Sequence, residues 1–494
     1  MSSSRDYEAA VTKLNTLQTN ASILEAIRKS GNTLNLKSIP EIRAFVQRIG
    51  YKVTDLDKLN IIHIAGTKGK GSTAAFCESI VRRFRTADEQ SRPLKTGLFT
   101  SPHLLEVRER LRIDGAPLQK ELFAKYFFEV WDRLEATKPS TIDEDHPDKP
   151  TYFRFLTLMA FHTFLSQNVD VVVLEVGLGG EYDSTNVVEN PVVCGITSLG
   201  IDHVAILGNT LTQIAWHKGG IMKRGIPTFV APQDEEAMVS LRKRVADIRP
   251  SKFIELNDSD IAKLNGHEIG LAGAHQQMNA AVAVSLCREW AVRRKDAGVA
   301  IAAPESAIDE GLRKTRWPGR GQIYVTKEYP SVTWFLDGAH TPESMVVCSA
   351  WYKDQMQKRR QLGGRRVLMF NCTNSRDGLV LLKSLVTLHN SDLPFAHIIF
   401  CSNDLYSKTT KVQNTDTMNY TVHKDPELKV QKELSAQWDQ LSGRKAEEGL
   451  VSVLPSISDA VELLGRMEGN LDVLVTGSLY LVGGTLNVLH AEVS

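Results

Sequence analysis

LNIIHIAGTKGKGSTAAFCESIVRRF, residues 59–84, predicts a buried strand, a glycine-rich turn and a helix in direct succession. Residues 59–65 are a short apolar run typical of a strand, and helical spacing begins at Ser72. The turn between them contains Gly66, Lys68, Gly69, Lys70 and Gly71. Such a turn points backbone N–H groups at a phosphate, while the helix dipole and a lysine ammonium add positive potential. We therefore predict a nucleotide triphosphate site at residues 66–73.

The turn differs from the standard P-loop in its spacing. Only two residues separate Gly66 from Gly69, and Gly71 intervenes between Lys70 and the hydroxyl pair Ser72–Thr73. The alternative is a strand–turn–helix joint that needs glycine only for its shape. Lysines have no structural reason to crowd a helix N-terminus, where the dipole disfavours positive charge. The two lysines and two hydroxyls therefore favour a phosphate ligand.

The length and charge of the chain limit its architecture and its partners. A chain of 494 residues is too long for one hydrophobic core and predicts two domains. Hydrophobic residues make up 42% of it and charged residues 24%, as in ordinary globular proteins. The formal net charge is +1, so we expect local clusters to hold any anionic substrate, and we expect no nucleic-acid partner.

The cysteines and the N-terminal segment indicate a reducing compartment. The six cysteines are single and show no CxxC pair, so neither a disulfide framework nor a zinc site is indicated; they are Cys77, Cys194, Cys287, Cys348, Cys372 and Cys401. The N-terminal segment lacks an apolar signal core and carries Asp6 and Glu8, which mitochondrial presequences avoid. No run approaches the ~18 apolar residues of a membrane span. We expect a cytoplasmic protein without a membrane partner, with a mitochondrial form from another start site left open.

Strand and helix patterns alternate along the first two thirds of the chain. Residues 6–56 predict two or three amphipathic helices, with turns at 29–33 and near Gly50. Strands are expected after them, at 59–65, 96–100, 169–176, 192–198 and 226–230. Helices are expected at 119–135, 152–165 and 211–222, and a surface loop at 136–150. This alternation predicts an α/β fold, with a P-loop ATPase-like doubly wound domain over residues 1–314.

The alternating pattern starts again near residue 315 and predicts a second, smaller domain. Strands are expected at 332–336, 366–370, 396–400 and 471–475, with helices between them. We assign residues 315–494 to a Rossmann-like α/β domain. Its basic segment KRRQLGGRR, residues 358–366, is either a solvated loop or a holder of an anionic substrate tail, and residues 402–425 form a polar insert.

Polar groups collect where the predicted strands end, which is where open α/β sheets bind their ligands. Ser101, Glu175 and His203 each follow a different strand. An acidic group at a buried strand end is costly unless it binds a cation, so the three side chains and triphosphate oxygens are candidates to share one Mg²⁺. The alternatives are a helix cap for Glu175, a turn former for Ser101 and a core histidine for His203.

Other candidate residues lie farther along the chain. Lys218 precedes two glycines inside a helical pattern and is hard to place on a surface. Asp337 and His340 follow the strand at 332–336. Arg320 lies between the two predicted domains, where an arginine can reach a γ-phosphate when domains close. The alternative for Arg320 is an ion pair between domains.

Ten segments together resemble the folylpolyglutamate synthase family of the Mur ligase superfamily, in particular its eukaryotic members. They are GTKGKGST, TSPHLLEVRERLRIDG, YFRFLTLMAF, VLEVGLGGEYDSTN, GIDHVAILGNTL, IAWHKGGI, GAHQQMNAAVA, WPGR, DGAHTPES and LVTGSLYLVGG. The resemblance runs in order from about residue 60 to 490 and is weakest in residues 402–450. It implies ATP-dependent addition of L-glutamate to the γ-carboxyl of a folate glutamate tail.

The resemblance also implies roles for individual residues. Gly66, Lys68, Gly69, Lys70, Gly71, Ser72 and Thr73 match the triphosphate loop, and Asn279, Arg320, Asp337 and His340 match nucleotide-contacting positions. Ser101, Glu175 and His203 match Mg²⁺ ligands, and Lys218 matches a lysine whose carbamate supports a second Mg²⁺. Lys70, Lys218 and His203 are thus the candidate catalytic residues. The resemblance further implies a monomer and leaves room for K⁺ or another monovalent cation.

One residue departs from the family pattern. Thr341 stands where the family usually has asparagine, which puts any role of that side chain in doubt, since a hydroxyl offers one donor instead of two.

The implied reaction proceeds through an acyl phosphate, because a carboxylate is a poor acyl donor. Lys70, Arg320 and the metal would neutralise the charge that develops on the phosphate. Two alternatives stay open: the sister enzyme dihydrofolate synthase, and a regulated ATPase without ligase chemistry.

Overall fold

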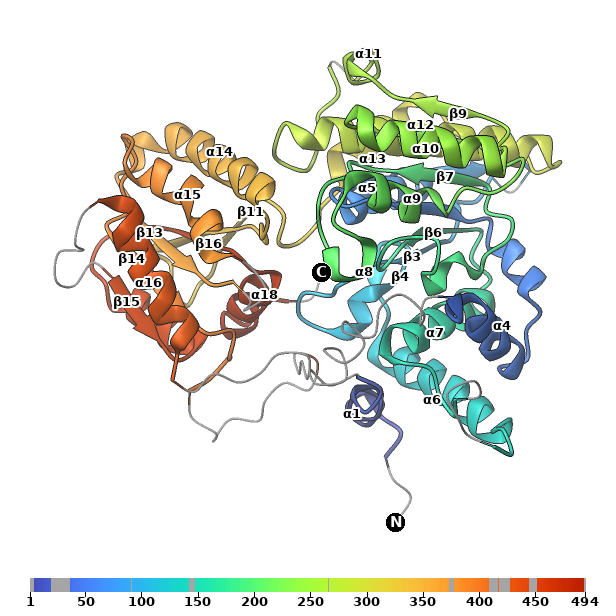
Figure 1. The fold of residues 1–494 in the computed structure, drawn as a ribbon, viewed down its shortest axis with the longest axis horizontal. Helices are drawn as coiled ribbons and strands as arrows, with labels where there is room; N and C mark the ends of the chain where they lie inside the picture. Colours follow the sequence, from blue (N-terminus) through green and yellow to red (C-terminus); the bar gives the residue numbers. More distant parts are fainter. Residues whose placement is uncertain are drawn as a thin grey trace. The chain divides into compact units, whose positions relative to one another are not determined.

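The computed structural model describes residues 4–18, 36–89, 91–141, 147–264, 266–372, 377–407, 416, 427–443 and 451–492. It divides into two compact units (Figure 1). Unit 1 contains Met1–His103, Val107–Gly270 and Ala274–Arg316, and unit 2 contains Leu104–Glu106, Leu271–Gly273 and Trp317–Ser494. The main division thus lies two residues beyond the predicted one. The assignment of Leu104–Glu106 and Leu271–Gly273 to unit 2 was not predicted, because it depends on how these segments pack and not on their composition.

Unit 1 is built around an eight-stranded sheet with the order β5-β4-β3-β6-β1-β7-β8-β9. Its strands are β1 (Ile62–Ala65), β3 (Thr96–Phe99), β4 (Leu111–Ile113), β5 (Ala116–Pro117), β6 (Val171–Glu175), β7 (Val193–Ile196), β8 (Thr228–Val230) and β9 (Phe253–Glu255). Strands β3, β6, β1, β7, β8 and β9 are parallel. A separate antiparallel pair is formed by β2 (Arg85–Thr86) and β10 (Ile301–Ala302).

Helices cover both faces of this sheet. Gly195 of β7 faces Leu286 of helix α12, whereas Gly97 of β3 faces Phe164 of helix α7 on the opposite face. The first face carries α5 (Lys70–Val81), α12 (His275–Asp296) and α13 (Glu305–Lys314). The other carries α7 (Tyr152–Ser166), α9 (Leu211–Gly219) and α10 (Glu235–Ile248). Helices α4 (Ser38–Arg48) and α6 (Lys120–Ala136) pack beside α7, and α1 (Tyr7–Asn15) packs against α6. The prediction of a doubly wound α/β domain is confirmed.

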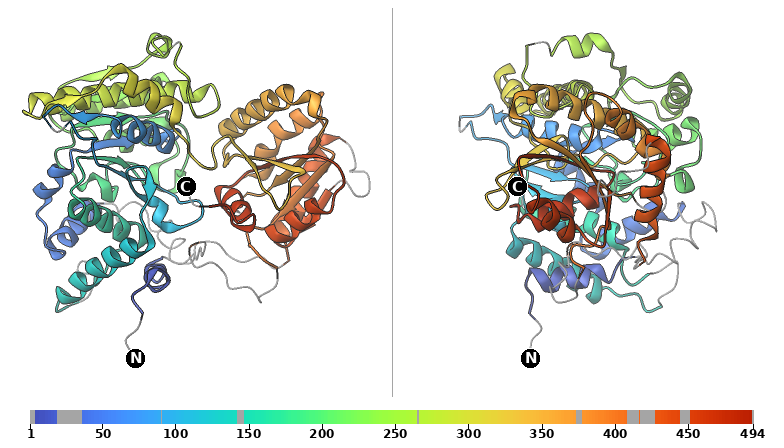
Figure 2. Two further views of the ribbon diagram at one scale, coloured as in Figure 1. Left: turned by 180° about the vertical axis from the view of Figure 1, so that it is seen from behind. Right: turned by 90° about the vertical axis from the view of Figure 1, so that its left-hand side faces the viewer.

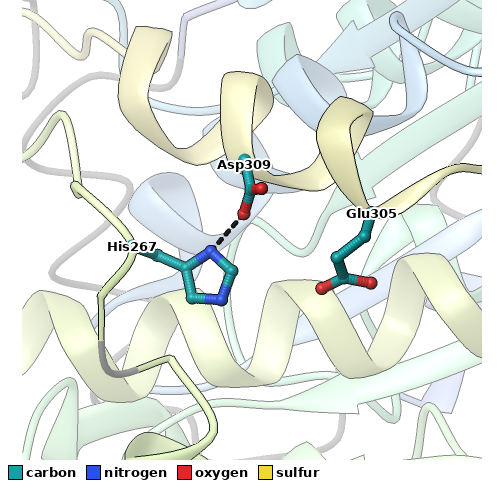
Figure 3. A group of neighbouring side chains, drawn as sticks. All are labelled: His267, Glu305 and Asp309. Atoms are coloured by element: carbon teal, nitrogen blue, oxygen red, sulfur yellow. Dashed lines mark ion pairs between the residues drawn. The ribbon is translucent and has the colours of Figure 1, made fainter.

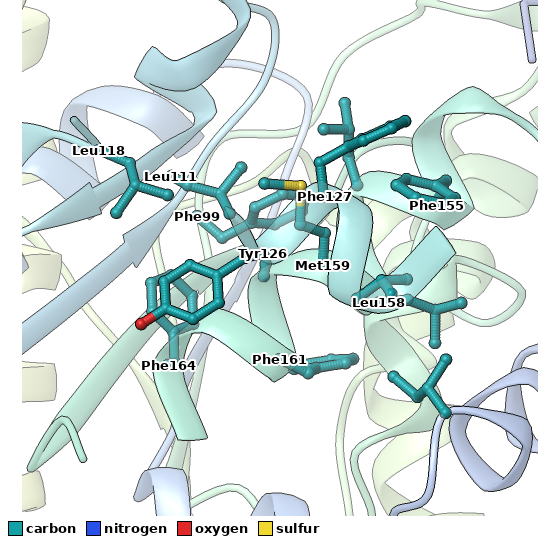
Figure 4. Packing of buried hydrophobic residues seen from close by; sticks show 14 of the residues in the cluster. Phe99, Leu111, Leu118, Tyr126, Phe127, Phe155, Leu158, Met159, Phe161 and Phe164 are labelled. Carbon is teal, nitrogen blue, oxygen red and sulfur yellow. The ribbon is translucent and has the colours of Figure 1, made fainter. Parts of the chain in front are cut away.

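An aromatic core supports the strands that lead to the candidate site (Figure 4). Phe127 of α6 and Phe155 of α7 are fully buried, with ring centroids 5.0 Å apart. Phe99 at the end of β3 and Leu174 near the end of β6 belong to the same cluster. Each buried phenylalanine contributes about 1.5–3 kcal/mol relative to an exposed one. The carboxyl ends of β3 and β6 therefore rest on a closely packed layer.

Unit 2, whose sheet and helices run from gold to red in Figure 2, contains a six-stranded sheet. The order of its strands is β11-β12-β16-β13-β14-β15. Its strands are β11 (Gln322–Val325), β12 (Val332–Leu336), β13 (Arg365–Phe370), β14 (His397–Cys401), β15 (Val451–Leu454) and β16 (Leu471–Thr476), of which only β11 is antiparallel to its neighbour. One face carries α14 (Pro342–Lys358), α15 (Gly378–His389) and α16 (Lys429–Ser442), and the other carries α17 (Ile457–Gly465) and α18 (Leu479–Val488). The Rossmann-like prediction is confirmed, although β11 and β15 were not predicted.

Several local expectations need correction or lie beyond the described residues. The hairpin of β4 and β5 was not predicted as strands, although its turn at Asp114–Gly115, with φ of 51° and 81°, is an Asp-Gly hairpin signal. The turn expected at 29–33 and most of the insert at 402–425 lie outside the described residues. All six cysteines are free and buried. No helix in the described ranges is long and apolar enough to cross a membrane.

The basic segment at residues 358–366 lies at the amino-terminal end of β13, the edge of the sheet opposite to the end of β12. Arg365 donates to the Glu468 carbonyl, and Arg366 Nε donates to the Pro394 carbonyl at 3.0 Å. Arg359 pairs with Asp472 at 3.2 Å. These contacts give the arginines structural partners, so the segment fits a structural loop better than a holder of a substrate tail.

Candidate active site

The parallel register brings several loops to one edge of the sheet in unit 1. Ile64 of β1 pairs with Glu175, the last residue of β6. Ala65, the last residue of β1, pairs with Ile196, the last residue of β7. Strand β3 runs in the same direction beside β6. The loops after β1, β3, β6 and β7 therefore begin at the same edge, where open α/β sheets bind ligands.

The glycine-rich loop after β1 approaches its neighbours too closely for side chains. Gly69 caps the N-terminus of α5 with a φ of 85°, in the left-handed region that favours glycine. A Cβ atom at Gly69 would overlap the side-chain amide of Asn279, and one at Gly66 would overlap the Thr197 hydroxyl. Glycine is therefore required at both positions. Asn279, which the resemblance implies as a nucleotide contact, lies against the loop at Gly69.

The segment after β7 holds the loop in place. The backbone N–H groups of Thr67 and Lys68 donate to the Ser198 carbonyl at 2.9 and 3.0 Å. The Thr67 hydroxyl donates to the Gly200 carbonyl at 3.1 Å, and the Thr197 hydroxyl donates to the Lys68 carbonyl at 2.6 Å. These bonds fix the loop before any ligand arrives. Thr197 was not predicted, although its place directly after a strand of the parallel sheet was a usable signal.

Three lysines surround the loop. Lys70 Nζ and Lys218 Nζ both donate to the Gly66 carbonyl, at 3.0 and 2.8 Å. Lys68 Nζ instead lies 3.3 Å from Asp202 Oδ2. Lys218 is only 3% exposed, and its burial, followed by the repulsion from Lys70, holds its pKa well below the ordinary lysine value. The Lys70 and Lys68 ammonium groups beside the loop suit an anion.

The first turn of α5 and the first turn of α12 share a polar network. Gln276 Nε2 donates to Ser72 Oγ at 3.3 Å, and Asn279 Nδ2 donates to Gln276 Oε1 at 2.9 Å. The Thr73 hydroxyl is fully buried and has no hydrogen-bond partner in the part of the chain that the structure describes. A bound phosphate or its metal would satisfy this orphaned group. Gln276 was not predicted, although it lies three residues before Asn279, on the same helix face.

Two of the three predicted metal ligands are in contact. Glu175 is 3% exposed, and its Oε2 accepts a hydrogen bond from the Ser101 backbone N–H at 3.0 Å. His203 follows β7, is exposed and has a φ of 53°, and its backbone N–H donates to Asp202 Oδ1 at 2.9 Å. A buried carboxylate at a strand end is an oxygen ligand that suits Mg²⁺, so Glu175 fits this ion. Ser101 contacts Glu175 through its backbone N–H, whereas His203 shows no contact with either residue among the interactions described.

A buried network supports the loop that follows Glu175. Asp183 accepts hydrogen bonds from the backbone N–H groups of Leu178 and Thr185 at 2.9 and 3.0 Å, and from the Thr185 hydroxyl at 2.6 Å. Burial raises the pKa of Asp183 despite these bonds. His63 Nε2 of β1 lies 2.9 Å from the Thr185 hydroxyl, and burial lowers the pKa of His63 to about 3. Neutral His63 thus links the central strand to this loop.

The predicted residues of unit 2 also form a group. Asp337 directly follows β12 and accepts hydrogen bonds from the Gly321 and Ala339 backbone N–H groups, at 2.8 and 2.9 Å. Burial raises the pKa of Asp337, and the positive charge of Arg320 opposes this shift. His340 Nδ1 lies 2.7 Å from the Gly338 carbonyl. The structure therefore gathers Arg320, Asp337 and His340 within unit 2.

Thr341, which departs from the family pattern, has a structural role. It is the N-cap of α14, and its hydroxyl accepts a hydrogen bond from the Ser344 backbone N–H at 3.4 Å. The side chain is 4% exposed. Threonine is a good N-cap, so the hydroxyl is used for helix capping.

A second polar cluster lies elsewhere in unit 1 (Figure 3). Within the described ranges, His267, Glu305 and Asp309 form the one group of three acidic or metal-ligating side chains whose atoms lie within 4.8 Å of one another. His267 pairs with Asp309, and Glu305 pairs with Arg288 at 2.5 Å. The guanidinium beside Glu305 opposes a second cation, so this cluster is best described as surface ion pairs.

The comparisons with known proteins agree with this geometry. The solved structure of Mycobacterium tuberculosis folylpolyglutamate synthase complexed with ADP matches with a TM-score of 0.70 and 21% identity, over 99% of this chain and 100% of that chain. This likeness shows that the two proteins share an α/β fold over nearly their whole length.

The relatives identify the family. Folylpolyglutamate synthase of Neurospora crassa is 41% identical over 99% of this chain and 92% of its own length. The probable folylpolyglutamate synthase of Schizosaccharomyces pombe is 40% identical over 99% of this chain and 95% of its own length. No family model matches the chain. With such identity over nearly its whole length, the chain belongs to the folylpolyglutamate synthase family, as the motifs predict.

Proposed function

We propose that the chain is an ATP-dependent ligase that adds L-glutamate to the γ-carboxyl of reduced folyl-glutamates and releases ADP and phosphate. The observation that carries this proposal is the convergence of Lys70 Nζ and Lys218 Nζ on the Gly66 carbonyl at the start of α5, in a chain of this family. The Lys70 ammonium and the N-terminus of α5 provide the positive potential that a triphosphate needs, and Lys218 places an amine beside the same loop. The substrates are ATP, L-glutamate and a reduced folate.

The roles of the chain's residues follow from the chemistry of the carboxylate. Direct displacement would require oxide as the leaving group, so the substrate carboxylate first attacks the γ-phosphorus and becomes an acyl phosphate. Loop residues 66–73 hold the phosphates, and Lys70 neutralises the charge that develops on the transferred group. The amine of L-glutamate then attacks the carbonyl carbon, phosphate leaves and the amine releases a proton. No covalent enzyme intermediate is formed.

Ser101, Glu175 and His203 are the residues that would hold Mg²⁺. When bound, the ion neutralises the phosphate oxygens. The buried Glu175 carboxylate supplies the negative charge, and its hydrogen bond from Ser101 N–H fixes the strand end that presents it. The lowered pKa of Lys218 favours its neutral amine, the form that adds CO₂ to give a carbamate. That carbamate would provide the carboxylate for a second Mg²⁺.

The residues of unit 2 are assigned on other grounds. Arg320, Asp337 and His340 are proposed nucleotide contacts, supported by the family resemblance and by their grouping around the Gly338 backbone. Asn279 is proposed as a nucleotide contact because it packs against the loop at Gly69. We also propose a monomer located in the cytoplasm, which rests on the sequence and on the family.

The proposed reaction is tested by measuring ADP release with Mg²⁺–ATP and L-glutamate, comparing tetrahydrofolate with dihydropteroate as the acceptor. Products are identified by mass. We expect tetrahydrofolate to gain glutamyl units and dihydropteroate to remain unchanged. Glutamylation of dihydropteroate alone would indicate the sister synthase. ATP hydrolysis indifferent to both acceptors would indicate a regulated ATPase.

The Lys70→Ala variant links this activity to the loop. It should lose ligase turnover because the phosphates lose a fixed cation. Lys58→Ala is the matched control, since Lys58 is 71% exposed and pairs only with nearby Asp55 among the contacts described. Unchanged turnover in Lys70→Ala would refute the assignment of the loop.

A further inference from the structure

The ion pair between Lys68 and Asp202 has no role in the reaction as proposed. Lys68 Nζ and Asp202 Oδ2 lie 3.3 Å apart, and their side chains are 31% and 15% exposed. Lys68 belongs to the loop, and Asp202 belongs to the segment after β7. The pair thus joins the phosphate loop to the strand end beside it.

The backbone of the loop does not depend on this ion pair. Five hydrogen bonds already hold Thr67 and Lys68 against residues 197–200. The two backbone N–H groups donate to the Ser198 carbonyl, the Thr67 hydroxyl donates to the Gly200 carbonyl and accepts from the Gly200 N–H, and the Thr197 hydroxyl donates to the Lys68 carbonyl. The carboxylate of Asp202 is itself fixed, because Oδ1 accepts the His203 backbone N–H at 2.9 Å. The ion pair therefore determines where the Lys68 ammonium lies, and it adds little to the shape of the loop.

The partner of Lys68 differs in charge from the partners of the other two lysines. Lys70 and Lys218 donate to the neutral Gly66 carbonyl, and neither forms an ion pair with a carboxylate among the contacts described. Lys68 is paired with a carboxylate, which is an anion like the phosphate. One ammonium on a flexible stem serves either anion, and a partly exposed ion pair is weak enough to exchange.

We propose that Asp202 is an internal counter-ion that competes with the nucleotide phosphates for Lys68. In the free protein Asp202 holds the ammonium, and a bound nucleotide draws it away. The inference rests on the proposed nucleotide site and adds a residue that tunes its affinity. Asp202 lowers the affinity for nucleotide and so speeds the release of ADP. It acts through Lys68 and is not itself a catalytic residue.

The size of the effect follows from the exposure of the pair. Partly exposed ion pairs stabilise by amounts that correspond to about a two- to fivefold change in an equilibrium constant. Removing the competing carboxylate should therefore tighten ADP binding by about two- to fivefold. Asp202→Asn is the appropriate change, because the amide oxygen still accepts the His203 N–H while the negative charge is lost.

The test is calorimetric titration of the full chain with ADP in the absence of Mg²⁺. Asp202→Asn should bind ADP more tightly and release it more slowly than the unaltered chain, and Lys68→Met should bind it more weakly. Asp247→Asn, which removes the same charge from an exposed position of α10, should leave the affinity unchanged. Thermal unfolding of each variant verifies that it is folded.

Each result bears on the proposal. Unchanged or weaker ADP binding by Asp202→Asn would overturn it, and so would normal binding by Lys68→Met. If the unaltered chain fails to bind ADP, the nucleotide site itself fails and the counter-ion role fails with it. If the unaltered chain binds ADP but Asp202→Asn shows no gain, only the counter-ion role is lost and the proposed ligase stands.

Discussion

Gly69→Ala tests whether the conformation of the loop controls nucleotide binding. Gly69 has a φ of 85° at the N-cap of α5, and an added Cβ would overlap the Asn279 amide. Asn279 has little room to move, because it is 5% exposed and donates to Gln276 at 2.9 Å. The substitution must therefore strain the loop or displace Asn279, and both changes disturb the proposed phosphate site.

Two free-energy costs of the Gly69→Ala substitution set the expected loss of ADP affinity. A side chain in the left-handed region costs about 1 kcal/mol relative to glycine. Displacement of the Asn279 amide loses a buried hydrogen bond to Gln276, which costs about 1 kcal/mol more. The sum is about 2 kcal/mol. If this whole cost falls on the loop conformation that binds ADP, it corresponds to roughly a 30-fold loss of ADP affinity.

Calorimetric titration with ADP measures this loss, and a second glycine provides the control. Gly225 has a similar φ of 74°, but an added Cβ there meets nothing within 4 Å. Gly225→Ala should lower the free energy of unfolding by about 1 kcal/mol and leave ADP affinity unchanged. Binding of ADP by Gly69→Ala within twofold of the unaltered chain would refute the reasoning.

Three further predictions concern other sites. Lys218→Ala should lose ligase turnover and regain part of it with added acetate, which supplies the missing carboxylate; full turnover without acetate would remove the carbamate role. Asp337→Asn should lower the free energy of unfolding of unit 2 by about 1–3 kcal/mol in urea titrations, because an amide N–H₂ group would face the Gly321 or Ala339 N–H. For His63 the pKa is about 3 in the folded chain against 6.5 in the unfolded chain, so the unfolded chain binds more protons between these values. Stability should fall as pH drops from 6.5 towards 3, and urea midpoints of His63→Leu should show a shallower fall.

Local patterns in the sequence were sufficient for much of the fold. The expected strand and helix in residues 59–84 appear as β1 and α5, and the strand expected at 332–336 is β12. Continuous β-branched runs and glycine turns are properties of neighbouring residues, so they can be recognised without knowledge of the fold. The short strands β11 and β15 escaped prediction, because their residues are only partly buried and their pattern is weak.

The candidate site was predictable only as a set of residue types at strand ends. Glu175 could be selected because an acidic group at a buried strand end is costly unless it binds a cation. Lys70 was selected from the glycine-rich turn, and Asp337 because it follows a strand. The partner of Glu175, the Ser101 N–H, lies after a different strand and could not be read from the residues around Glu175. Thr197 and Gln276 lie near features that the sequence does show, a strand end and Asn279, but their contacts with the loop came only from the structure.

The sequence alone was sufficient to predict the family, the alternation of strands and helices, and a glycine-rich loop with lysines. Each of these can be recognised from neighbouring residues or from motifs along the chain. The tertiary structure decided which of these residues meet and in what environment. Lys218 is 152 positions from Gly66, and only folding buries its ammonium against that carbonyl and depresses its pKa. Folding likewise places Asp202 beside Lys68 and Leu104–Glu106 in unit 2. Burial and charge proximity arise from contacts between distant segments, which no local pattern encodes.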